Sequence, residues 1–253
     1  MNKIQSDLLA KINFVDHGFF DRTGGVSNGP FESLNVGLHK GDDLDSVLQN
    51  RKKIADHFGV SLDDMIILNQ QHSDIVHVID DKNVGTFRLK DIESFLSNEA
   101  VHGDAIITNM SGLLIGVNTA DCAPILLCDR DTMYIAAVHA GWRGAVGNII
   151  GNTIAKLKEL GCKNIVAAIG PCIEKQSFAV GTDVTSVVEQ RYLSNVGGKI
   201  LFDMQLLILD KLLREDIKTV SKLNINTVTN RDFFSYRRQA SNCGVQFSGI
   251  IVR

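Results

Sequence analysis

Three residues that are able to bind a transition metal stand where short apolar runs of the sequence end: His72, Cys122 and His139. Imidazole nitrogen and thiolate sulfur are ligands that suit zinc. Three protein ligands with a fourth position left to water are the pattern of a catalytic zinc site, which lowers the pKa of the bound water to about 7. The wide spacing of the three residues leaves open, at this point, whether they are ligands or packed side chains.

Two of the same residues would also suit a different chemistry. Cys122 could act as a nucleophile and His139 as its base, as in a thiol hydrolase or amidase. A thiolate bound to zinc is largely quenched as a nucleophile, so metal content distinguishes these two hypotheses. Asp104 follows His102-Gly103 just before an apolar run, and its carboxylate could orient a metal-binding histidine. The remaining histidines have no partner at a convincing spacing.

Arginines form a second group of residues that could do chemistry. Arg143 lies in a Gly-Trp-Arg-Gly turn that leads into a predicted helix, where backbone N–H groups favour anions. Arg237 and Arg238 follow the aromatic segment 233–236, and Arg51 lies on an earlier predicted helix. A guanidinium can bind phosphate through two parallel hydrogen bonds, and an aromatic ring can stack on a base or sugar. We expect anion binding from Arg143 and Arg237, whereas Arg51 and Arg238 could equally be solvated or ion-paired.

The elements that position these residues follow from the hydrophobic pattern. A helix is predicted after Gly41-Asp42-Asp43, where an aspartate can cap it, with a stop at Gly59. Further helices are predicted over Asn148–Leu160, Thr182–Tyr192 and Met204–Leu213. The strands are predicted at Met65–Leu68, Ile75–Ile79, Ala105–Thr108, Leu113–Val117, Pro124–Cys128, Tyr134–Val138, Ile165–Ile169 and Val245–Val252. Strands outnumber helices and several connections have hairpin length, which favours an α/β or α+β fold with mixed sheets.

Composition restricts the class of protein. The chain has 253 residues, of which 44% are hydrophobic, and a net charge of −3. We expect a single domain over residues 1–253, with no basic surface for nucleic acid and no membrane span. The N-terminus lacks the pattern of a signal peptide, and five scattered cysteines suit reduced thiols. These features predict a cytoplasmic protein.

Taken together, the motifs closely resemble those of the YfiH-like family, known as multicopper polyphenol oxidoreductase or laccase-domain proteins. Its members have been described as purine nucleoside phosphorylases with adenosine deaminase activity. The resemblance spans nearly the whole chain and rests on the segments 30–35, 41–43, 50–51, 70–73, 104–105, 119–122, 139–144, 169–173 and 234–238. One departure is Ser177, where many relatives have a cysteine.

The resemblance implies a layered α/β/β/α fold and one zinc ion per chain, held by His72, Cys122 and His139. It implies phosphorolysis of adenosine, inosine or methylthioadenosine, with adenosine deamination as a side activity. We expect a monomer or homodimer whose partners are a purine nucleoside and phosphate. The residues that we assign are, for catalysis, Arg143, Arg237, Asp121 and Cys122, and, for substrate binding, Arg51, Gln71, Phe234 and Tyr236.

Three alternatives stay open. The family label suggests copper and phenol oxidation, although three candidate ligands cannot build a four-copper centre. The Cys122 and His139 pair could belong to a thiol hydrolase or amidase that acts on cell-wall precursors. Finally, the chain could be a non-enzymatic module that holds a metal or binds a partner.

Overall fold

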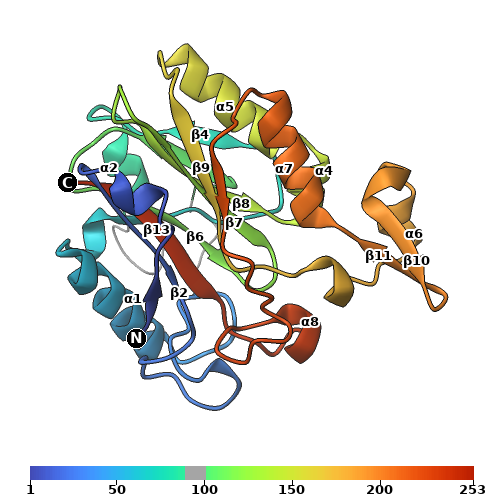
Figure 1. Ribbon diagram of the computed structural model, residues 1–253. Coiled ribbons are helices and arrows are strands. Elements are labelled where there is room, and N and C mark those ends of the chain that lie inside the picture. The colour runs from blue at the N-terminus through green and yellow to red at the C-terminus, as the bar shows by residue number, and fades with distance from the viewer. Residues whose placement is uncertain (89–100) are drawn as a thin grey trace.

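The computed structural model describes residues 1–88 and 101–253, and Figure 1 shows two β-sheets with helices outside them. The first sheet has five strands, of which β13 is central and pairs with β2 and β6, whereas β1 and β3 form the edges. Only the β3–β6 pair is parallel in this sheet. In spatial order its strands are β1 (Lys3–Ile4), β2 (Val15–Phe20), β13 (Gln246–Val252), β6 (Leu114–Thr119) and β3 (Met65–Ile67).

The second sheet has six strands and is also mixed. Its two edge pairs, β12–β9 and β4–β5, are parallel, and the pairs between them are antiparallel. In spatial order its strands are β12 (Val220–Lys222), β9 (Ile165–Ile169), β7 (Ala123–Asp129), β8 (Ile135–Ala140), β5 (Ala105–Thr108) and β4 (Val76–Val78).

The helices differ greatly in length. Among the described residues, the three long helices are α1 (Leu44–Phe58), α5 (Ile149–Glu159) and α7 (Met204–Arg214). The short helices are α2 (Val84–Phe87), α4 (Trp142–Val146), α6 (Thr182–Thr185) and α8 (Tyr236–Gln239). A hairpin of β10 (Leu193–Val196) and β11 (Lys199–Phe202) projects from the body of the molecule together with α6 (Figure 1).

Helix α1 shows how the local sequence sets an element. The side chain of Asp43 accepts a hydrogen bond from the backbone N–H of Ser46 at 2.9 Å and so caps the first turn. Gly59 adopts φ +68°, a left-handed conformation that suits glycine and ends the helix. Ile54 and Phe58 are fully buried against the five-stranded sheet, and burial of each such side chain stabilises the fold by about 1.5–3 kcal/mol. The predicted helix is therefore confirmed.

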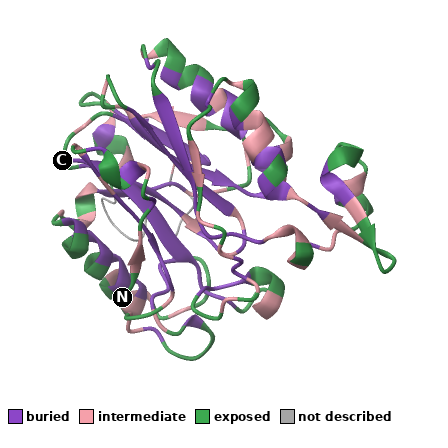
Figure 2. Cartoon of the chain, viewed as in Figure 1, coloured by how far each residue is buried: buried purple, intermediate pink, exposed green. Residues whose placement is uncertain are grey.

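Three apolar cores separate four layers. One core joins α5 and α7 to the outer face of the six-stranded sheet, through residues such as Ile154 and Ile208. A second lies between the two sheets and includes Leu126 and Ile250, and a third joins the five-stranded sheet to α1. Figure 2 shows the strands of both sheets as almost continuously buried, apart from the edge strands β1, β4 and β12. The predicted α/β/β/α layering with mixed sheets is therefore confirmed.

The strand predictions hold within about two residues, and one helix prediction is wrong. Residues 182–192 do not form one helix, because α6 ends at Thr185 and the chain re-forms only a 3₁₀ turn at Gln190–Tyr192. This stretch is rich in Val, Thr and Ser, which are weak helix formers. All five cysteines carry free thiols. Among the described residues, no helix combines the length and the apolar character that crossing a bilayer requires.

Candidate functional site

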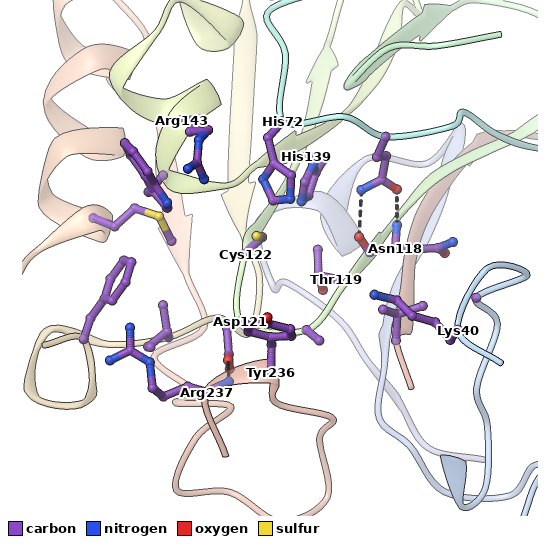
Figure 3. A pocket seen from close by; sticks show the side chains of 18 of the residues that line it. Lys40, His72, Asn118, Thr119, Asp121, Cys122, His139, Arg143, Tyr236 and Arg237 are labelled. Carbon is purple, nitrogen blue, oxygen red and sulfur yellow. Dashed lines mark hydrogen bonds between the residues drawn. The ribbon is translucent and has the colours of Figure 1, made fainter. Parts of the chain in front are cut away.

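The three predicted metal ligands meet where strands of both sheets end. Cys122 lies in the turn between β6 and β7, His139 lies near the end of β8, and His72 lies in the loop after β3. Their ligand atoms all lie within 4.8 Å of one another. Figure 3 shows both imidazole rings beside the sulfur, at the wall of a pocket. Within residues 1–88 and 101–253, no other three His, Cys, Asp or Glu side chains gather in this way.

A single buried carboxylate, Asp104, contacts both histidine segments. Its Oδ1 accepts hydrogen bonds from His139 Nδ1 at 2.7 Å and from the backbone N–H of His72 at 3.1 Å. Its Oδ2 accepts from the backbone N–H groups of Gln71 and Ser73, at 3.2 and 2.7 Å, and from the Ser73 hydroxyl at 2.6 Å. Because His139 uses Nδ1 for this bond, Nε2 is the nitrogen left to bind a metal.

The electrostatic interactions within this cluster favour the charged forms of Cys122, His139 and Asp104. Burial would raise the pKa of the Cys122 thiol, but the charge of His139 and hydrogen bonds from both histidines lower it to about 6. Burial would lower the pKa of His139, but the Cys122 thiolate and the hydrogen bond to Asp104 raise it to about 9. Burial would raise the pKa of Asp104, but hydrogen bonds from His139 and Ser73 lower it to about 2. Cys122 is therefore held as a thiolate, the form that binds metals and acts as a nucleophile.

Gly141 leaves room for the ligand side chains. A Cβ atom at this position would lie 2.2 Å from Nδ1 of His72 and 3.1 Å from Sγ of Cys122. The shorter distance is below any real contact, so a larger residue here would displace the imidazole. The donor set fits zinc: two imidazole nitrogens and one thiolate sulfur converge, and one side of the group faces the pocket.

The pocket beside these ligands has a volume of about 800 Å³, within the range of small-molecule sites. Its lining comes from the N-terminal loop, from both sheets, and from segments near residues 180 and 240. Figure 3 shows Arg143 and Arg237 on one side of the metal ligands and Lys40 with Asn118 on the other. The pocket therefore has two ends of different composition, with the metal ligands between them.

Both arginines that we expected to bind an anion line this pocket. Arg143 is exposed on α4, and its guanidinium lies 4.2 Å from the centre of the Trp142 ring. Arg237 is exposed on α8, where its Nη1 donates to the carbonyl of Ala179 at 2.7 Å and its guanidinium lies 5.2 Å from the Phe178 ring. These contacts fix the direction of each guanidinium and leave further N–H groups to a ligand.

Asp121 also lines the pocket, but its carboxylate is engaged by other parts of the chain. Its Oδ1 accepts from the Thr227 hydroxyl at 2.6 Å. Its Oδ2 accepts from the Ser235 hydroxyl at 3.0 Å and from the backbone N–H of Arg237 at 2.6 Å. These bonds join the strand end that carries Cys122 to the C-terminal loop, so Asp121 positions α8 beside the ligands.

The expected substrate-binding residues divide into two pairs. Arg51 and Tyr236 line the pocket, and the Tyr236 side chain is 57% exposed. Phe234 is fully buried beneath the guanidinium of Arg22, so its ring is not accessible to a ligand. Gln71 is not among the lining residues, and its Nε2 lies 2.7 Å from Nδ1 of His102. The structure therefore places Phe234 and Gln71 outside the pocket.

Several lining residues were not anticipated from the sequence. Gln70, rather than Gln71, lines the pocket, and its amide exchanges two hydrogen bonds with the backbone of Asn118, at 2.8 and 2.7 Å. Phe178 and Met204 reach the pocket from distant segments, and no local signal in the sequence could have found them. Lys40 was detectable in principle, because it directly precedes the Gly41-Asp42-Asp43 segment.

Several known proteins are similar to this chain over most of its length. A purine nucleoside phosphorylase of Corynebacterium glutamicum is 35% identical over 230 residues, which cover 88% of this chain and 89% of that protein. The adenosine deaminase RL5 of an unknown prokaryotic organism is 33% identical over 247 residues, covering 91% and 92%. A purine nucleoside phosphorylase of Deinococcus radiodurans is 34% identical over 239 residues, covering 91% and 86%.

Solved structures show the same fold. The YfiH protein of Bacillus licheniformis superimposes with a TM-score of 0.87 at 27% identity and covers 96% of this chain and 94% of its own. The YlmD protein of Geobacillus stearothermophilus has a TM-score of 0.87 at 26% identity, covering 96% and 93%. The family model described as multi-copper polyphenol oxidoreductase laccase matches residues 16–253. The chain therefore belongs to this family.

Proposed function

We propose that this protein is a zinc-dependent purine nucleoside phosphorylase of the cytoplasm. It would act on adenosine, inosine and methylthioadenosine, with adenosine deamination as a side activity. The relatives named as phosphorylases and as an adenosine deaminase support the general reaction. The observation that carries the proposal is one pocket of about 800 Å³ that combines His72, Cys122 and His139 with three arginines, Arg51, Arg143 and Arg237.

The metal in this proposal is one zinc ion held by His72, Cys122 and His139. When bound, zinc would supply a Lewis acid for a substrate oxygen and a source of hydroxide at neutral pH. Asp104 keeps His139 oriented through the 2.7 Å bond to Nδ1, and the charge of His139 with the hydrogen bonds from both histidines keeps Cys122 ionised.

The phosphate in this proposal lies between Arg143 and Arg237. An oxygen of phosphate attacks the anomeric carbon of the sugar while the bond from that carbon to the purine nitrogen breaks. Positive charge develops on the sugar ring, and the phosphate dianion beside it stabilises that charge. The two guanidinium groups orient the dianion, and the exposed ring of Tyr236 offers a surface on which the purine can stack.

In this proposal Asp121 and Arg51 position other parts of the pocket. Asp121 holds α8, and with it Tyr236 and Arg237, against the strand end that carries Cys122. Arg51 lines the opposite end of the pocket, where its burial and its hydrogen bond from Nε to the carbonyl of Val36, at 2.9 Å, fix its direction.

The test is product analysis with purified protein of measured metal content. Incubation with adenosine should give adenine and ribose 1-phosphate only when phosphate is added, and Cys122→Ala should abolish both products. Arg143→Ala should raise the phosphate concentration that is required for half-maximal rate. An unchanged phosphate dependence in Arg143→Ala would contradict the role of that arginine, and release of inosine alone would reassign the protein as mainly a deaminase.

A second candidate function is supported by one observation, the thiolate of Cys122 beside His139. This pair would suit a thiol hydrolase or amidase that acts on cell-wall precursors. Activity of metal-depleted protein that is lost on alkylation of Cys122 would favour it. The family description favours copper and phenol oxidation, and several copper atoms per chain with oxygen uptake would support that reaction. Within the described residues, only one group of three ligands is present.

A further inference from the structure

The end of the pocket opposite Arg143 and Arg237 contains buried polar atoms without partners. Thr119 and Asn118 line this end, at the terminus of β6. The side-chain oxygens Oγ1 of Thr119 and Oδ1 of Asn118 are both shielded from solvent and have no hydrogen-bond partner. Thr119 is only 2% exposed. Buried polar atoms almost always have partners, so a hydroxyl without one in the wall of a cavity indicates a ligand that supplies it.

The loop that forms this end is tightly built. Asn35 and Asn50 are fully buried. Oδ1 of Asn35 accepts from the backbone N–H groups of Gly37 and Val245, at 3.1 and 3.0 Å. Nδ2 of Asn50 donates to the carbonyl of Asn35 at 2.8 Å. The sequence segments around Asn35 and Asn50 have no place in the proposed reaction, and their role here is to shape the pocket wall.

The same loop directs a lysine along the wall. The alkyl stem of Lys40 lies over Gly37, where a Cβ atom would come within 2.8 Å of Lys40 Cγ. Lys40 and Arg51 both line the pocket, and Arg51 is 4% exposed. His39 also lines the pocket, and burial and then the charges of Arg51 and Lys40 lower its pKa. The positive charges of a lysine and an arginine thus converge on this end.

A phosphate group matches the cations and the hydroxyl of Thr119, whereas the amide oxygen of Asn118 only accepts and would need a protonated phosphate oxygen as its donor. Its oxygens accept hydrogen bonds from an ammonium, a guanidinium and a hydroxyl. The carboxylates that line the pocket, Asp121 and Asp183, belong to the part that carries Arg237 and residues 173–184. The Lys40 end therefore differs from a site for a cation or for an apolar group.

We propose that Lys40, Arg51 and Thr119 form a second phosphate subsite, distinct from the Arg143 and Arg237 pair. The inference rests on the proposed function in that phosphate is a co-substrate of the pocket. The phosphate group has two chemical sources: inorganic phosphate, or the phosphoryl group of a nucleotide that binds with its base near the metal ligands.

The experiment measures binding of inorganic phosphate and of adenosine 5′-monophosphate by titration calorimetry of the zinc-loaded protein. Lys40→Ala and Thr119→Val should each weaken one of the two ligands at least fivefold. Thr119→Val should leave the melting temperature unchanged or raise it, since its hydroxyl has no partner in the protein. Lys53→Ala is the matched control, because Lys53 is exposed on the same helix as Arg51 and lies outside the lining.

The pattern identifies the source of the phosphate group. Weakened inorganic phosphate assigns the subsite to the co-substrate, and weakened monophosphate with unchanged inorganic phosphate assigns it to a nucleotide. Affinities of both variants that equal the Lys53→Ala control for both ligands would overturn the subsite. Failure of the wild-type protein to cleave adenosine in phosphate would overturn the proposed function instead, and the binding comparison would still decide on the subsite.

Discussion

Two carboxylates, Asp104 and Asp121, organise the two sides of the pocket in different ways. Asp104 lies behind the metal ligands, is 1% exposed, and accepts bonds from His139 Nδ1 and from the backbone of residues 71–73. Asp121 is 8% exposed and accepts bonds from two hydroxyls and from the backbone of Arg237, more than 100 residues away along the chain.

The two carboxylates therefore have different expected roles: Asp104 affects the metal-binding group, and Asp121 affects the binding of substrate. Asp104 contacts an ionisable ring directly, so it influences which nitrogen of His139 bears a proton and how the ring is turned. Asp121 contacts only groups that do not titrate near neutral pH, so it acts by holding a segment in place. Loss of Asp104 should therefore change metal binding, and loss of Asp121 should change the affinity for phosphate.

The largest expected effect comes from Asp104→Asn. The substitution keeps the shape of the side chain but removes the charge that accepts five hydrogen bonds. We expect zinc affinity to fall about 10- to 100-fold and the free energy of unfolding to fall by about 3 kcal/mol. Competition with a chromophoric chelator measures the first quantity, and urea unfolding measures the second.

A matched control is Asp129→Asn. Asp129 is a fully buried carboxylate outside the pocket that accepts backbone N–H bonds from Asp131, Thr132, Lys163 and Asn164. This variant should lose stability and keep its zinc affinity. Equal zinc affinities for both variants would show that Asp104 has only a structural role.

Gly141→Ala should impair the metal side without touching Asp104. The added Cβ would lie 2.2 Å from the His72 ring, so the ring must move away from Cys122 and His139. We expect a loss of zinc affinity of about tenfold, near the lower end of the range for disturbed ligand positions. Metal analysis after dialysis against a chelator is the measurement, and zinc content equal to wild type would show that the His72 loop adapts freely.

Asp121→Asn should affect the other side. The amide cannot accept all three bonds, so α8 and Arg237 should lose their fixed position at a cost of about 1–2 kcal/mol in stability. We expect the KM for phosphate to rise about tenfold, with zinc content unchanged. A tenfold change corresponds to a free energy of about 1.4 kcal/mol. Loss of zinc in this variant would break the division between the two carboxylates.

The smallest effect should come from Gln71→Ala, compared with Gln70→Ala. Gln70 forms two hydrogen bonds to the backbone of Asn118 beside the pocket, whereas the side chain of Gln71 is hydrogen-bonded to His102 outside it. Steady-state kinetics should show a change of less than about twofold for Gln71→Ala and a clear rise in KM for Gln70→Ala. The reverse order would mean that the loop after β3 turns when substrate binds.

The sequence predicts elements well where one local signal dominates. Helix α1 has a cap at Asp43 and a stop at Gly59, and β5 and β9 are apolar runs of the right length. The β10–β11 hairpin was overlooked although Gly197 and Gly198, both at positive φ, are a strong turn signal. The hairpin follows residues 182–192, where the apolar pattern predicts a helix that the structure does not contain.

The site was predictable only in part for a related reason. His72, Cys122 and His139 stand where polar residues interrupt apolar runs, and the structure brings their ligand atoms within 4.8 Å of one another. Which of two neighbours faces the pocket depends on the turn of the backbone, so Gln71 was chosen instead of Gln70. Phe234 and Tyr236 are both aromatic and two residues apart, and only packing against Arg22 shows that Phe234 is internal.

The central place of β13 in its sheet has a consequence for synthesis of the chain in the cell. Gln246 pairs with Thr119, three residues before Cys122, and β13 also holds β2. A ribosome releases residues 246–252 after every metal ligand has emerged, and until then β6 lacks its neighbour on that side. The end of β6 beside Cys122 therefore reaches its final hydrogen-bonded position only after β13 has been synthesised. We expect metal uptake to be post-translational rather than co-translational.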